Sequence, residues 1–222
     1  MDKTESSNNQ EVIAPAEAKI AGLSHRVFGI IKFLLGLCFL PLVYSVTAAF
    51  LSELSLTEKW SQDYFWAGVI TLVMIHLFVW EPAYIYAKGH KIIELLFSFF
   101  KPLVKVAPYL LPIYTILLFA IYGIMNMAAP NSEWLRYFVF FFGFSIGLHL
   151  IFGAKTLRAK KNDFLKSNYI FGFSFVYIVD VFFLSFGLSL IFEKFSFVNF
   201  SNNSYQIAKT IFAAVFKQLF LR

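Results

Sequence analysis

Long apolar segments constrain this chain more than any other feature of its sequence. Residues 27–51 carry no charge apart from Lys32, and at 1.5 Å per residue they are long enough to cross a hydrocarbon core of roughly 30 Å. Residues 64–86, 134–154 and 169–192 have the same character. Of the 222 residues, 59% are hydrophobic, whereas soluble domains are about 45–50% apolar. The sequence therefore predicts an all-α polytopic membrane protein in contact with the lipid bilayer.

Shorter segments complete the predicted helices. Residues 113–127 are expected to form a fifth span. Residues 88–101 form an apolar helix of about four turns, which is too short to cross alone and is therefore expected to be embedded. Residues 205–222 repeat apolar side chains at helical spacing, which is typical of an amphipathic helix on a membrane surface.

The composition changes along the chain and divides it into three parts. Residues 1–24 are polar and predict a disordered cytoplasmic tail. Residues 25–198 are expected to form one helical membrane domain. Residues 199–222 begin with a polar run and continue into the amphipathic carboxyl-terminal helix.

The loops between the predicted spans are alternately rich and poor in Lys and Arg. Five basic residues lie within residues 155–166, and none lies within 128–133. Because positive loops stay in the cytoplasm, the amino terminus is expected to be cytoplasmic, in a bacterial inner membrane. The net charge of +6 then reflects topology, so nucleic acid is not an expected partner. The single Cys38 excludes a disulfide within the chain.

Ionisable residues inside the predicted helices indicate a site, because placing them in a membrane is costly. His90 and Glu94 are four residues apart, on one helical face, and could offer a nitrogen and an oxygen to one metal ion. Asp180, in the middle of a span, or His149 could supply a third ligand. The alternative is that Lys88, Lys91 and Glu94 form a solvated face with His90 at the membrane surface.

Two segments carry a resemblance to a known family. The first reads Glu81-Pro82-x-Tyr84-Ile85-Tyr86-x-x-Gly89-His90, and the second reads Ala107-Pro108-Tyr109-Leu110-Leu111-Pro112-Ile113-Tyr114-Thr115. Their order resembles that of the membrane zinc metallopeptidases of the site-2 protease type. A subgroup of that family has a Gly-His-Glu-x-x-His-Ala helix followed by an Ala-Pro-Tyr-x-x-Pro-x-Tyr-Thr segment. The resemblance covers roughly residues 64–192.

The resemblance implies a degenerate site. His90 matches the first zinc ligand, Lys91 takes the place of the general-base Glu, and Glu94 takes the place of the second His. A charged Lys accepts no proton from metal-bound water, and its cation opposes metal binding. No peptide hydrolysis and no cofactor are therefore expected, with zinc on His90, Glu94 and Asp180 only if the site is retained. Without a metal, Lys91 is expected to form an ion pair with Glu94 or Asp180.

Three functions are compatible with these residues. The first is a proteolytically inactive scaffold or subunit of a membrane complex, which contacts other membrane protein subunits through small residues such as Gly143 and Gly187; packing of these residues within the chain is the alternative. The second is an intramembrane metallopeptidase with an altered metal site. The third is a transporter or channel subunit in which Glu81, His76 and Asp180 carry protons.

Overall fold

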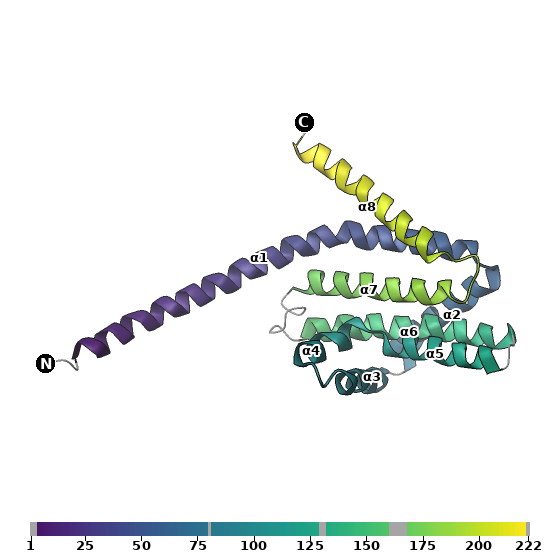
Figure 1. The fold of residues 1–222 in the computed structure, drawn as a ribbon, viewed down its shortest axis with the longest axis horizontal. Helices are drawn as coiled ribbons and strands as arrows, with labels where there is room; N and C mark the ends of the chain where they lie inside the picture. Colours follow the sequence, from purple (N-terminus) through teal and green to yellow (C-terminus); the bar gives the residue numbers. More distant parts are fainter. Residues whose placement is uncertain (1–3, 80, 129–131, 160–167, 221–222) are drawn as a thin grey trace.

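The computed structural model describes residues 4–79, 81–128, 132–159 and 168–220. These residues form eight α-helices and one π-helical segment and contain no strand (Figure 1), which confirms the predicted all-α membrane protein. The helices are α1 (Thr4–Leu56), α2 (Lys59–Met74), η1 (Ile75–Val79), α3 (Ala83–Leu96), α4 (Lys101–Leu110), α5 (Ile113–Ala128), α6 (Ser132–Ala159), α7 (Tyr169–Ser189) and α8 (Phe197–Phe220).

Four helical segments in the described residues are long and apolar enough to cross a membrane. They are Val27–Leu56, Lys59–Val79, Glu133–Arg158 and Tyr169–Ser189. The predicted fifth span corresponds to α5, which has 16 residues. At 1.5 Å per residue α5 is about 24 Å long, shorter than a hydrocarbon core of roughly 30 Å. Pro112 fixes its start, because a proline has no N–H to continue the preceding helix.

The second predicted span ends earlier than its apolar character indicated. Residues 64–86 were expected to be one helix, but the helix that begins at Lys59 ends at Val79, and α3 starts afresh at Ala83. Pro82 accounts for the break, since it cannot donate to the preceding turn. The predicted embedded helix at 88–101 is likewise replaced by two helices, α3 and α4, joined by a turn at residues 97–100.

The two ends of the chain are more helical than expected. Helix α1 begins at Thr4, whereas a disordered tail was expected over residues 1–24. Extending an existing helix needs no new nucleus, which favours continuation of the first span toward the amino terminus. The carboxyl-terminal helix α8 starts at Phe197 and so includes the polar run before residues 205–222, where the helical pattern was predicted; Leu221 and Arg222 lie outside the described residues.

Glycines bring α2 and α6 into backbone contact. A Cβ added to Gly68 would collide with the carbonyl oxygen of Phe140, and one added to Gly143 would collide with that of Phe65. A Cβ at Gly187 would meet a Phe ring of α5 in the same way. These glycines therefore pack within the chain, which is the alternative given above for Gly143 and Gly187 to contact with other subunits. Small residues at such positions let membrane helices approach closely.

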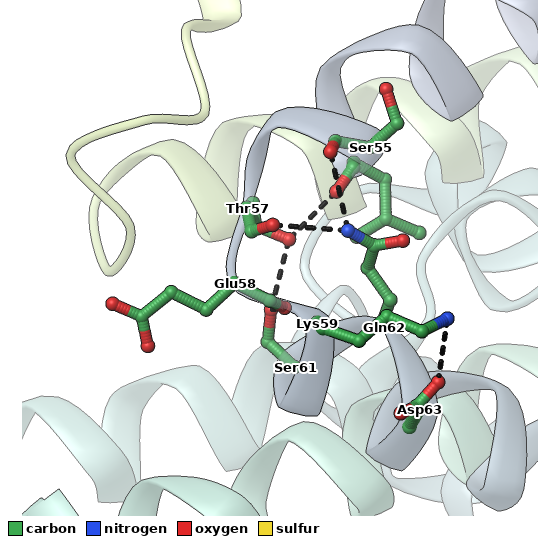
Figure 2. A network of polar contacts seen from close by, with 8 residues as sticks. Ser55, Thr57, Glu58, Lys59, Ser61, Gln62 and Asp63 are labelled. Carbon is green, nitrogen blue, oxygen red and sulfur yellow. Dashed lines mark hydrogen bonds and ion pairs between the residues drawn. The ribbon is translucent and has the colours of Figure 1, made fainter.

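Polar side chains close the turn between α1 and α2 (Figure 2). The Ser61 hydroxyl donates to the Thr57 hydroxyl at 2.8 Å, and the side-chain amide of Gln62 donates to the Thr57 carbonyl at 3.0 Å. Lys59 and Asp63 form an ion pair at 3.0 Å. The Gln62 amide also donates to the Ser55 carbonyl at 3.2 Å. The last carbonyls of a helix have no donor within that helix, so Gln62 satisfies one of those that end α1.

A buried carboxylate near the end of α1 holds the start of α8. Glu53 is 2% exposed and accepts hydrogen bonds from the Ser196 backbone N–H at 3.1 Å and from the Asn203 side-chain amide at 3.5 Å. A negative charge is favourable at the first turn of a helix, because the free N–H groups there carry partial positive charge. From this anchor α8 runs back across α1 and then leaves the bundle (Figure 1).

Replacing Gly68 by Ala tests the close contact of α2 with α6. The added methyl group has no space beside the Phe140 carbonyl, so we expect Gly68→Ala to lower the free energy of unfolding by about 1–3 kcal/mol. Thermal unfolding in detergent measures the change. Gly123→Ala is the matched control, because nothing lies within 4 Å of an added Cβ there. Equal stability of the two variants would contradict this packing.

Candidate functional site

The candidate site is organised around a break in the backbone between α4 and α5. The Ala107 carbonyl accepts from the Leu111 N–H at 2.9 Å, but Pro112 has no N–H to offer the next carbonyl. The N–H of Ile113 turns back to the Leu111 carbonyl at 2.8 Å. The Tyr109 carbonyl, whose ordinary helical donor would be Ile113, therefore needs a donor from elsewhere.

His149 of α6 supplies that donor. Its Nε2 lies 3.0 Å from the Tyr109 carbonyl oxygen, and a carbonyl can only accept, so Nε2 carries the proton. The same Nε2 lies 3.6 Å from the Oδ2 atom of Asp180, on α7. Asp180 is fully buried, and neither of its oxygens has a hydrogen-bond partner among the described residues. We call His149 and Asp180 the interior pair His149–Asp180. Through His149 this pair connects α4, α6 and α7.

The rest of the second resemblance segment ties α5 to its neighbours. The Tyr114 hydroxyl donates to the Ile85 carbonyl of α3 at 2.5 Å, and the Thr115 and Ser145 hydroxyls of α5 and α6 lie 2.8 Å apart. Gly89 of α3 leaves room for this contact, because a Cβ there would lie 2.7 Å from the Tyr114 ring. The segment thus has a structural role that its residues explain without a substrate.

A second pair lies on α3. His90 Nε2 is 3.5 Å from Glu94 Oε1, and the His90 ring meets the Tyr109 ring edge-on with centroids 4.8 Å apart. The Glu94 side chain is 46% exposed, so this outer pair His90–Glu94 reaches solvent. The buried face of α3 is formed by Tyr86, Gly89 and Ile93, at helical spacing. His90 stands beside that face, which turns its ring toward α4.

The structure does not gather the three residues expected to share a metal. Among the described residues, no three His, Cys, Asp or Glu side chains lie close enough to hold one ion. His90 pairs with Glu94, whereas Asp180 pairs with His149. The single ring of Tyr86 packs near both imidazoles, with centroids 6.0 Å from His90 and 5.9 Å from His149.

Lys91 does not occupy the place expected for it. Its side chain is exposed, and no carboxylate of the described residues lies within ion-pair distance, so the expected ion pair with Glu94 or Asp180 is not formed. The reason is helical geometry: successive residues of an α-helix point about 100° apart, so a residue next to the inward-turned His90 points away from the interior.

Two spaces adjoin these residues. A cavity of about 10 Å³ is lined by both histidines, with Tyr86, Tyr114 and Ser145 among its other walls. That volume suits about one water molecule. A groove of about 510 Å³ lies between α3 and the carboxyl-terminal end of α6. Tyr86 and His90 line both spaces.

The residues expected to form a proton path have separate surroundings. Exposed Glu81 pairs with Lys155 of α6, whose hydrogen bond holds the pKa of the Glu81 carboxyl below its usual value. His76 lies in η1 and packs edge-on against Phe152, with centroids 5.4 Å apart. Asp180 instead faces His149. The sequence interpretation did not include Lys155 in this site. The signal that could have found it is its place as the first basic residue after the predicted span 134–154.

Comparisons with known proteins give no relative. None of the protein-family models, curated proteins or solved structures compared with the chain matches it. The candidate site is therefore defined by its own geometry, which consists of the interior pair His149–Asp180, the outer pair His90–Glu94 and the groove beside α3.

Replacing His149 tests its role as the donor to the Tyr109 carbonyl. We expect His149→Phe to lower the free energy of unfolding by about 1–3 kcal/mol, because the buried Tyr109 carbonyl loses its hydrogen bond from His149. His149→Gln, which keeps an N–H donor, should recover part of that loss. His76→Phe is the matched control, since its Nδ1 makes no hydrogen bond to the described residues. Thermal unfolding would contradict the role if the Phe and Gln variants at 149 were equally stable.

Proposed function

We propose that this protein is a proteolytically inactive, site-2-protease-like membrane protein that serves as a scaffold or subunit of a membrane complex. The observation that carries the proposal is the division of the expected site into two pairs. His149 is hydrogen-bonded to the Tyr109 carbonyl and lies 3.6 Å from Asp180, while His90 lies 3.5 Å from Glu94. Among the described residues, neither pair is joined by a third His, Cys, Asp or Glu side chain that could complete a metal site.

The residue at the general-base position supports the same proposal. Lys91 stands next to His90 along α3 and carries a positive charge toward the groove. A peptidase of this type needs a carboxylate there to take a proton from metal-bound water. A cation at that position instead raises the cost of placing a divalent ion between the two side chains of the outer pair.

The proposed orientation follows from the basic residues. Lys91 and Lys155 line the groove, and Lys88 and Arg158 lie on the same two helices, α3 and α6; we call this part of the bundle the basic end. Because loops rich in Lys and Arg stay in the cytoplasm, we assign the basic end and the amino terminus to the cytoplasmic side of a bacterial inner membrane.

The outer helices support a role as a subunit. Helix α1 has 53 residues and is about 80 Å long, well beyond a hydrocarbon core of roughly 30 Å. In its most apolar window 6% of the residues are buried within the chain, against 61% for α6. The second half of α8 also leaves the bundle (Figure 1). These two helices therefore offer the largest surfaces for another membrane protein.

Restoring the peptidase motif tests the loss of metal binding. We expect the purified wild-type protein to hold far less than one zinc per chain, and the double variant Lys91→Glu, Glu94→His to hold more, since it gains a second imidazole and loses the cation. Elemental analysis by mass spectrometry measures the zinc. His90→Ala in the restored variant is the control and should remove the gain. One zinc per wild-type chain, lost on His90→Ala, would contradict the proposal.

Photo-crosslinking in native membranes tests the subunit role. A photoreactive residue at Leu35 of α1 or Phe216 of α8, which are 43% and 57% exposed, should give adducts with another protein. The same probe at Ile124 of α5, 68% exposed, is the control and should react mainly with lipid. Gel mobility and mass spectrometry identify the adducts. Lipid adducts alone at all three positions would count against a partner on α1 and α8.

A further inference from the structure

The groove beside α3 has the size and lining of a ligand site. Its volume of about 510 Å³ lies within the range of roughly 300–1,000 Å³ found for small-molecule sites. Polar and apolar side chains of α3, of the segment before it and of the end of α6 line it together. They are Glu81, Ala83, Tyr86, Ala87, His90, Lys91, Glu94, Phe152, Lys155 and Thr156.

Both signs of charge are present in the groove, and they are arranged unevenly. Lys155 is engaged by Glu81, and Glu94 is engaged on one side by His90 at 3.5 Å. Lys91 has no carboxylate within ion-pair distance among the described residues. The 46% exposed Glu94 side chain retains free surface for a donor. The groove therefore presents a cation that lacks an anion beside a carboxylate that can accept further hydrogen bonds.

The spacing of these two charges limits the ligand. Lys91 and Glu94 are three residues apart on α3, and such residues are neighbours on a helix surface, about 5–6 Å apart at Cβ. A ligand that meets both must carry an anion and a cation a few bonds apart. The hydroxyl of Thr156, which also lines the groove, adds a neutral hydrogen-bonding group.

The outer surface of α3 next to the groove is apolar. Ile92, Leu95 and Leu96 are 41%, 75% and 58% exposed, and they follow Lys91 and Glu94 along the helix. This combination of basic residues with exposed apolar side chains is typical of a helix at the boundary between headgroups and acyl chains. A ligand of the groove would therefore have its charged part in the groove and its apolar part along α3.

We propose that the groove binds the headgroup of a phospholipid that carries a phosphate and a primary ammonium, as in phosphatidylethanolamine. The phosphate lies by Lys91 and Lys155, the ammonium donates to Glu94, and the acyl chains follow Ile92 and Leu95. The two methylene groups between phosphate and ammonium suit neighbouring charges of opposite sign on one helix face. A quaternary ammonium has no N–H for Glu94, and a glycerol headgroup has no cation. The inference is independent of peptidase activity and of a partner subunit.

Competition between lipids of equal acyl chains tests this assignment. The full-length protein in detergent is mixed with equal amounts of phosphatidylethanolamine, phosphatidylglycerol and phosphatidylcholine, and bound lipid is counted by native mass spectrometry. We expect one phosphatidylethanolamine per chain at a several-fold excess over the other two. Lys91→Gln should reduce this binding several-fold. Glu94→Gln should remove the preference over phosphatidylglycerol, because only the ammonium needs that carboxylate.

Two further measurements complete the test: a control variant outside the groove and competition by a free headgroup. Lys209→Gln removes an exposed charge on α8, away from the groove, and should leave the lipid count unchanged. Free phosphoethanolamine, which lacks acyl chains, should not displace the lipid at equal concentration. Displacement would indicate that the groove binds a soluble amine phosphate and would overturn the assignment to a lipid. Equal binding of the three lipids, or wild-type binding by both groove variants, would overturn the proposal.

Discussion

The structure depends on how the backbone carbonyls at the break between α4 and α5 find hydrogen-bond donors. In a membrane every backbone polar group needs a partner within the protein, so a break at Pro112 is tolerated only where other side chains replace the lost helical bonds. His149 provides this replacement for the Tyr109 carbonyl at 3.0 Å. That one hydrogen bond fixes the tautomer of the imidazole and sets its Nε2 against Asp180. The position of α4 depends on this contact. So does the position of the Tyr109 ring of α4, against which His90 packs.

Sequence reasoning located the membrane helices because their apolar character is a property of each segment alone. It failed at the breaks, where the composition hardly changes. Residues 64–86 are uniformly apolar except near Glu81, yet the helix ends at Val79 because Pro82 removes a donor. The polar composition of residues 1–24 predicts disorder, but composition does not prevent a neighbouring helix from extending, and α1 begins at Thr4.

The candidate site was harder to predict than the helices, because it depends on which helix faces which. The spacing of His90 and Glu94 placed them on one helical face, where they lie 3.5 Å apart, although the expected contact was with a shared metal ion. The spacing could not place Asp180, whose partner lies on α6 rather than α3. One signal was present in the sequence: His149 is a polar residue within a span, and Pro112 leaves a carbonyl that requires such a donor. Joining these two facts needs the packing of α4 against α6.

The charge of Lys91 decides between the two roles open to the outer pair His90–Glu94. A divalent metal on this pair would gain two ligands and would sit beside an ammonium one residue along the chain, so repulsion would offset part of the gain. A phosphate in the groove would be attracted by the same ammonium, and Glu94 would then serve the positive end of the ligand instead of a metal. At the position that the proposed resemblance gives to a general base, Lys91 thus opposes a divalent cation and attracts an anion on its side of the groove.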